Sequence, residues 1–226
     1  MTRERSFAVY EAPAGLRVRG TIVVVPGRGE ATLSYQRFGK RLAADAYRVL
    51  VVEDLDGFDP GSDVVRPLVL VGADLGAVRV AVDGDRLAPD AVVLAGLPGG
   101  GEVTGDDELD ARTHCPTHRG VLADVDPGAF ATAIEAELLH RAYARASGVP
   151  HLLLIGDADP LADHEALARL AKALPVARLA VVRGAHHDVL NDLQHRSVAA
   201  EIVSFLEAVR EGTPPRPLVR VESSGW

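Results

Sequence analysis

The chain has 226 residues, of which 47% are hydrophobic and 25% are charged, and its formal net charge is −8. This length suits a single domain with a substantial core. The acidic balance argues against a surface that binds nucleic acid or an anionic membrane, because phosphate groups would repel it.

Cysteine content and hydropathy bear on where the protein is expected to reside. The chain has one cysteine, Cys115, so it cannot form an internal disulfide. This is typical of a reducing compartment. No apolar run approaches the roughly 20 residues of a membrane-spanning helix, and residues 1–6 contain no apolar signal segment. We therefore expect a cytoplasmic protein without a membrane partner.

The N-terminal part alternates apolar runs with segments of helical periodicity. Residues 6–13 and 16–25 predict a hairpin that leads into a buried strand at 21–25. A helix is expected at 34–46 and a second buried strand at 48–53. The Gly-, Pro- and Asp-rich segment that follows is too short for a full crossover helix, so a loop or a short stub is predicted there.

The stretch around Asp74 has the pattern of a nucleophile elbow, in which a strand runs into a sharp turn and then a helix. Pro67 and the branched apolar residues at 68–71 lead into Gly72-Ala73-Asp74-Leu75-Gly76, and residues 75–82 can be helical. Small residues at 72 and 76 allow strand and helix to approach, so the side chain at 74 projects above the sheet. A carboxylate stands where this pattern usually has a serine hydroxyl.

The C-terminal part resumes the alternation after an irregular segment. Strands are predicted at 91–96, 150–155 and 177–182, together with a helix that Asp163 caps and a long closing helix. We predict an α/β fold, with a doubly wound, mostly parallel sheet of about seven or eight strands and helices on both faces. The expected organisation is a core at 1–96 and 149–210, a small helical lid at 97–148 and a C-terminal tail at 211–226.

Reactive residue types follow the ends of three predicted strands. Asp74 comes first, an acid at Asp157 or Asp159 second, and a histidine at His186 or His187 third. This is the chain order of nucleophile, acid and histidine in an α/β-hydrolase triad. Asp157 is favoured as a turn residue and His186 as a surface or supporting histidine.

These features resemble the α/β-hydrolase superfamily over essentially the whole chain. The segment Pro26-Gly27-Arg28-Gly29-Glu30 and the stretch at 42–47 are similar to the lysophospholipase and monoglyceride-lipase branch. The resemblance assigns the acid to Asp159, through its spacing from Gly156, and the histidine to His187, through its spacing from Gly184. The N–H groups of Arg28 and Leu75 are the expected oxyanion hole.

An aspartate at the elbow is what a resemblance to epoxide hydrolases and haloalkane dehalogenases implies. In that chemistry a carboxylate attacks an sp³ carbon and becomes an alkyl ester, which a histidine-activated water then hydrolyses. Dehalogenases commonly have Trp after the nucleophile, whereas this chain has Leu75, so we expect epoxide opening ahead of dehalogenation. The expected substrate is a small, mainly apolar molecule, and Tyr143, His114 and His118 of the lid are the predicted substrate contacts.

Two alternatives to this hydrolase remain open. The protein could be a non-catalytic or ligand-binding relative, or a serine esterase whose nucleophile has been replaced by Asp74. A zinc site at Cys115 and His118 is disfavoured, because structural zinc needs four ligands and no second Cys/His pair lies nearby in the sequence. We therefore predict no metal and no cofactor, and the sequence leaves a homodimer open.

Overall fold

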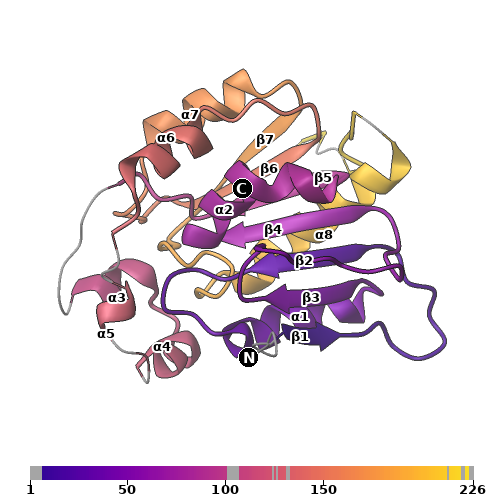
Figure 1. The fold of residues 1–226 in the computed structure, drawn as a ribbon, viewed down its shortest axis with the longest axis horizontal. Helices are drawn as coiled ribbons and strands as arrows, with labels where there is room; N and C mark the ends of the chain where they lie inside the picture. Colours follow the sequence, from indigo (N-terminus) through magenta and orange to yellow (C-terminus); the bar gives the residue numbers. More distant parts are fainter. Residues whose placement is uncertain are drawn as a thin grey trace.

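The structure is a computed structural model that describes residues 7–100, 107–123, 125, 127–130, 133–212, 214–219 and 222–223. Its strands are β1 (Phe7–Tyr10), β2 (Thr21–Val25), β3 (Arg48–Val52), β4 (Leu68–Ala73), β5 (Ala91–Ala95), β6 (His151–Gly156) and β7 (Ala177–Val182). Its α-helices are α1 (Gln36–Ala44), α2 (Leu75–Asp83), α3 (Asp107–Arg112), α4 (Pro116–Leu122), α5 (Pro127–Phe130), α6 (Ala136–Tyr143), α7 (His164–Ala173) and α8 (His195–Glu211). Two 3₁₀ helices, η1 (Thr32–Tyr35) and η2 (Gly84–Leu87), complete the described elements (Figure 1).

All seven strands belong to one sheet, in the order β1-β3-β2-β4-β5-β6-β7. Among the strand pairs that the structure describes, only β1–β3 is antiparallel. The mostly parallel sheet predicted from the sequence is therefore confirmed. The expected N-terminal hairpin is wrong, because β2 already has parallel partners on both sides, β3 and β4, so β1 pairs with β3 at the edge of the sheet.

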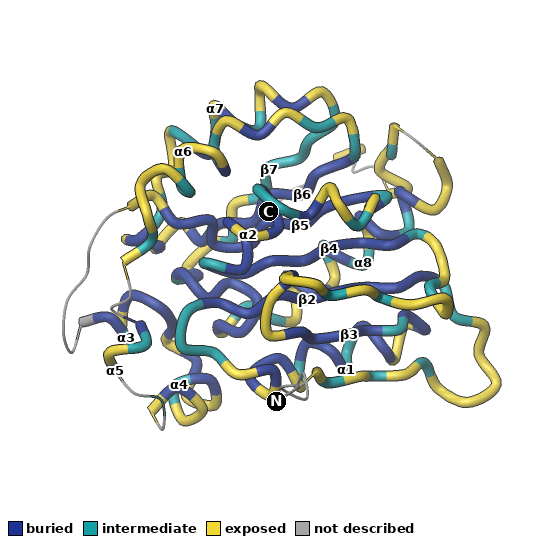
Figure 2. Tube along the Cα trace, in the orientation of Figure 1, coloured by how far each residue is buried: buried dark blue, intermediate teal, exposed yellow. Residues whose placement is uncertain are grey.

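Helices cover both faces of the sheet, and the alternation of side chains along β2 shows why. Ile22 and Val24 join the core cluster that includes α1 and α8, whereas Val23 and Val25 join the cluster that includes α2 and α7. Successive side chains of a strand point to opposite faces, so a strand covered on both sides must be apolar throughout. The dark central strands and the mixed outer helices in Figure 2 follow this pattern.

The connection between β3 and β4 contains no helix, as predicted. Among the described residues, no helix is long and apolar enough to cross a membrane.

Helices α3, α4 and α5 gather at the end of the sheet toward which the parallel strands point (Figure 1). Two backbone hydrogen bonds tie α3 to the loop after β7, His187 N–H to Ala111 O (3.2 Å) and Asp188 N–H to Arg112 O (2.8 Å). The predicted lid region thus touches the loop that carries the predicted histidine. Its division from the core as a separate insertion stays a prediction.

Candidate active site

Asp74 lies at the turn between β4 and α2, where the backbone has φ 47° and ψ −120°. A positive φ is uncommon for any residue other than glycine, and such strain persists where the surrounding structure enforces it. Close packing enforces it here, since a Cβ on Gly72 would lie 2.3 Å from Gly76 O and a Cβ on Gly76 would lie 2.1 Å from Val25 O. The local geometry is that of a nucleophile elbow, with an aspartate at its apex.

The three predicted triad residues contact one another. His187 Nδ1 lies 2.9 Å from Asp159 Oδ2, and His187 Nε2 lies 3.2 Å from Asp74 Oδ1. All three residues are buried. The histidine loop approaches the sheet closely at Gly96, where an added Cβ would lie 2.3 Å from His187 O. An imidazole is thus held between two carboxylates at the carboxyl ends of three strands.

The alternative residues of the same loops have other partners. Asp157 Oδ1 accepts the Gly184 N–H at 2.6 Å, and Asp157 is exposed. His186 Nδ1 lies 3.0 Å from Asp192 Oδ2. Neither residue has a described contact with Asp74, which agrees with the preference for Asp159 and His187.

Two guanidinium groups cover the Asp74 carboxylate, and sequence reasoning predicted neither. Arg28 donates to Oδ2 from its backbone N–H and from Nε, both at 2.9 Å, and to Oδ1 from Nη2 at 2.9 Å. Arg112 donates to Oδ2 from Nη2 at 3.2 Å. Only the backbone N–H of Arg28 was expected to reach this position. Among the described hydrogen bonds none joins the Leu75 N–H to the Asp74 side chain, so the role of Leu75 stays a prediction.

The surrounding charges set the protonation states of Asp74 and His187. Burial would raise the pKa of Asp74, but His187 and the two guanidiniums lower it well below its usual value. Burial would lower the pKa of His187, but Asp159 and Asp74 raise it to about 10. At neutral pH Asp74 is therefore a carboxylate and His187 an imidazolium, and the imidazolium lies between Asp74 and Asp159.

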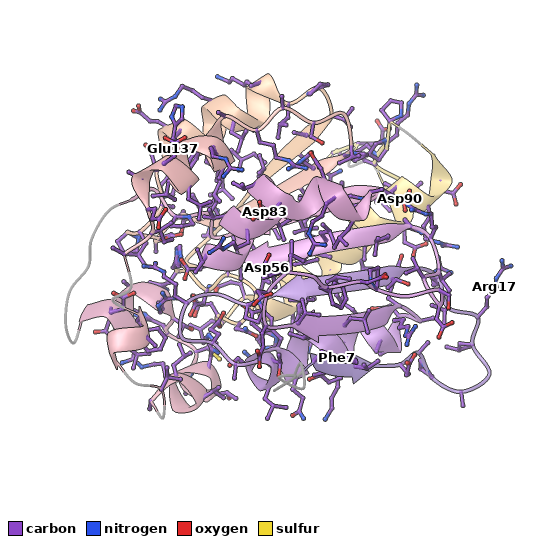
Figure 3. The ribbon with its side chains drawn as sticks, viewed as in Figure 1. Phe7, Arg17, Asp56, Asp83, Asp90 and Glu137 are labelled. Carbon is purple, nitrogen blue, oxygen red and sulfur yellow. The ribbon has the colours of Figure 1, made fainter. Side chains whose placement is uncertain are left out.

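Arg112 connects this line to a second group of buried charges. Its side chain is fully buried, and it donates to Asp188 Oδ1 from Nη1 at 3.1 Å and to Glu108 Oε1 from Nε at 3.2 Å. Its guanidinium also lies 4.9 Å from the centre of the Phe130 ring. Ordinary charged side chains of the chain, such as Arg17 and Glu137, are exposed (Figure 3). Buried ions need partners of this kind, so Arg112 holds several carboxylates in place at once.

The predicted substrate contacts have partners outside the Asp74 carboxylate. Tyr143 O–H donates to Leu97 O at 3.3 Å, and the exposed His114 stacks on His186 with ring centres 3.8 Å apart. The buried His118 lies with its Nε2 3.1 Å from Asp188 Oδ2 and 3.3 Å from Glu30 Oε1. Their roles as substrate contacts stay predictions. Glu30, His118 and Asp188 are also the described residues whose ligand atoms could surround a metal ion, as these atoms lie within 4.8 Å of one another.

The sheet order, the elbow and the three strand-end loops define an α/β-hydrolase fold, and solved structures share it. A soluble variant of monoglyceride lipase from Saccharomyces cerevisiae, in complex with a substrate analog, has a TM-score of 0.69 at 14% identity, covering 90% of this chain and 91% of that one. Monoacylglycerol lipase from Paleococcus ferrophilus has a TM-score of 0.68 at 18% identity, covering 92% and 100%. MenH from S. aureus has a TM-score of 0.62 at 14% identity, covering 90% and 98%.

A protein-family model described as TAP-like protein matches residues 134–217, a segment that contains Asp159 and His187. This match covers the C-terminal part of the chain, and the solved structures show that the fold is the α/β-hydrolase fold that the sequence predicted. A search of curated proteins finds no match.

Proposed function

We propose that the protein is a hydrolase whose Asp74 carboxylate attacks an sp³ carbon of a small, mainly apolar substrate, an epoxide in preference to an alkyl halide. The observation that best supports this proposal is the unbroken line of contacts from Asp159 through His187 to Asp74 at a strained elbow. These are the parts of a nucleophile, its histidine base and an orienting acid. Two of the solved structures that share this fold are lipases, which supports the choice of a hydrolase.

In the first step, an oxygen of Asp74 forms a bond to the substrate carbon while the C–O bond of the epoxide breaks. The products are an alkyl ester on Asp74 and an alkoxide, which takes a proton from solvent or from a lid side chain. Asp74 then no longer carries a negative charge beside His187. Because one of the two carboxylates that raise the pKa of His187 is lost, the imidazolium releases its proton and becomes a base.

In the second step, neutral His187 takes a proton from a water molecule that attacks the ester carbonyl carbon. Asp159 orients the imidazole, and negative charge develops on the carbonyl oxygen. The Arg28 N–H, which lies 2.9 Å from Oδ2, is placed to stabilise that charge. Collapse of the intermediate releases a diol and restores the Asp74 carboxylate and the His187 imidazolium, so one water is consumed for each epoxide.

The Arg28 guanidinium must withdraw before an oxygen of Asp74 can reach a substrate. Asp74 is 1% exposed, the Arg112 side chain is fully buried, and the Arg28 side chain is 13% exposed. Of the two guanidinium groups that contact Asp74, that of Arg28 is therefore the one that can move. Its Nη1 donates to Phe130 O at 3.3 Å, so this movement would also release a contact with α5. Beside Asp74, the freed guanidinium could then stabilise the departing oxygen.

A non-catalytic binding protein is the second candidate, and the charged groups that surround the Asp74 carboxylate favour it. A carboxylate that accepts hydrogen bonds from Arg28, Arg112 and His187 together is a weak nucleophile, because each charged donor stabilises the negative form. In this alternative the ion pairs stabilise the elbow and no ester forms.

Covalent trapping separates these candidates. The His187→Gln variant is incubated with styrene oxide, 1,2-epoxyhexane and 1-bromohexane, and its intact mass is measured. The hydrolase proposal predicts a stable adduct that peptide mapping assigns to Asp74, because the ester forms but is not hydrolysed. The matched Asp74→Asn, His187→Gln double variant should form none. The proposal fails if no probe forms an adduct or if the double variant is labelled equally, and ester hydrolysis gained by Asp74→Ser would indicate a serine-esterase ancestor.

A further inference from the structure

We propose that Glu30, His118 and Asp188 form a binding site for one divalent first-row metal ion, with Zn²⁺ as the best-matched ion. The site is separate from the proposed chemistry at Asp74. It joins three segments that are far apart in the sequence, namely the loop after β2, helix α4 and the loop after β7.

The spacing of the ligand atoms suits a small metal ion. His118 Nε2 lies 3.3 Å from Glu30 Oε1 and 3.1 Å from Asp188 Oδ2, and all three atoms lie within 4.8 Å of one another. Zinc binds nitrogen and oxygen at about 2.0–2.2 Å with tetrahedral angles, which separates neighbouring ligand atoms by roughly 3.4 Å. Small movements of these side chains would therefore admit the ion, with a fourth position left for water.

One ligand atom lacks the hydrogen bond that a buried oxygen needs. The Glu30 side chain is only 1% exposed, and within the described residues its Oε1 accepts no hydrogen bond. Its charged neighbour is His118, whose Nε2 lies 3.3 Å away without a hydrogen bond between them, so a lone pair of this buried oxygen is left for a metal ion to accept. Glu30 Oε1 faces His118 Nε2, which is the direction in which the proposed ion would lie.

The second oxygen of each carboxylate is already held by another donor. Glu30 Oε2 accepts the Gly27 N–H at 2.8 Å and the Tyr35 hydroxyl, and Asp188 Oδ1 accepts Arg112 Nη1 at 3.1 Å. Such outer contacts orient metal ligands in proteins. They leave one oxygen from each carboxylate directed toward the imidazole, so the site resembles a set of three single-atom ligands.

The fixed charges around the site also favour a cation. Among the described residues, the connected buried group contains five carboxylates, two guanidiniums and two imidazoles, namely Glu30, Asp74, Glu108, Asp159, Asp188, Arg28, Arg112, His118 and His187. The five carboxylates thus outnumber the guanidiniums and imidazoles together by one. Imidazole nitrogen with carboxylate oxygen is a ligand set that zinc accepts. This proposal assigns His118 to the ion, whereas the sequence predicted it as a substrate contact.

Titration with Zn²⁺ and Co²⁺ tests the site without any substrate. The tag-free full chain is treated with EDTA, dialysed, and equilibrated overnight with each ion, because the ligands are buried. We expect one Zn²⁺ per chain by calorimetry, visible Co²⁺ absorption of the kind given by four-coordinate sites, and a melting temperature raised by about 5–10 °C at a hundredfold excess over Kd. Glu30→Gln and Asp188→Asn should each weaken Zn²⁺ binding at least tenfold, and His114→Gln, an exposed histidine near α4, should leave it unchanged.

Several results would overturn the proposal. These are no saturable binding of either ion, binding that both carboxylate variants retain, or binding that His114→Gln abolishes. Melting curves of the metal-free variants establish that each is folded. If Asp188→Asn does not fold, Glu30→Gln alone decides the outcome, because Gln keeps the size of the side chain and removes the charge. Metal binding is measured without any substrate, so the result does not depend on whether the His187→Gln variant forms an adduct at Asp74.

Discussion

Replacing Arg112 by Met should destabilise the protein more than any exposed charge substitution. The Arg112 side chain is fully buried and binds Asp74, Asp188 and Glu108 at 3.1–3.2 Å. Methionine fills similar space but leaves these carboxylates without their shared cation. Breaking a buried pair by removing one partner costs about 3–5 kcal/mol, because an uncompensated charge stays buried. With three partners affected, we expect a loss of unfolding free energy near the upper end of that range.

Urea unfolding followed by far-UV circular dichroism measures this effect. Arg169→Met is the matched control, since Arg169 lies on α7, is 68% exposed and pairs with Glu165 at 3.6 Å. An exposed pair of this kind contributes about 0–0.5 kcal/mol. Adding Asp74→Asn to Arg112→Met should recover part of the loss, as one buried charge is removed. If Arg112→Met loses no more stability than Arg169→Met, the buried ion-pair interpretation is wrong.

Three further predictions concern the elbow, pH and a helix end. Gly76→Ala should prevent stable folding, because its Cβ would lie 2.1 Å from Val25 O, whereas Gly120→Ala in α4 meets nothing within 4 Å and should be neutral or stabilising by up to about 1 kcal/mol in thermal melts. Burial and the charge of Arg145 lower the pKa of His151 to about 4, so protonation of His151 favours the unfolded state. The unfolding free energy should keep the full contribution of His151 above pH 6.5 and lose ~3 kcal/mol of it as the pH falls to 4. A His151→Gln variant whose unfolding free energy fell with the same slope would contradict this. Asp163→Ala should cost about 1 kcal/mol in urea unfolding, because the Asp163 side chain accepts the Ala166 N–H at 2.8 Å, and an unchanged midpoint would argue against this cap.

Features encoded by neighbouring residues could be predicted from the sequence. The glycines at 72 and 76 identify the elbow because each must lie against backbone atoms of the adjoining segments. The apolar strands predict a sheet covered on both faces, since both parities of side chain are buried. Strand ends that meet at one edge of a parallel sheet predicted that Asp74, an acid at 157 or 159 and a histidine at 186 or 187 lie together, and the family resemblance chose Asp159 and His187.

Features that depend on distant partners could not be predicted in the same way. The predicted N-terminal hairpin was wrong because it assumed that neighbouring segments of the chain pair. In the structure β2 pairs with β3 and β4 on its two sides, so β1 pairs with β3. Arg112 has Glu108 one turn earlier, a spacing typical of exposed helix pairs, so nothing local indicates that it reaches Asp74. Arg28 was expected to offer its backbone N–H, and the direction of its side chain depends on a carboxylate 46 residues away.

The most direct test of the proposed role of Asp74 follows the source of the product oxygen. The native protein, in molar excess over an epoxide that it converts, completes a single turnover in H₂¹⁸O, and the product and the Asp74 peptide are analysed by mass spectrometry. The alkyl-ester route predicts that ¹⁸O enters the Asp74 carboxylate while the diol receives ¹⁶O from it, because water attacks the ester carbonyl and not the substrate carbon. A first-turnover diol that carries ¹⁸O, with an unlabelled Asp74, would contradict it.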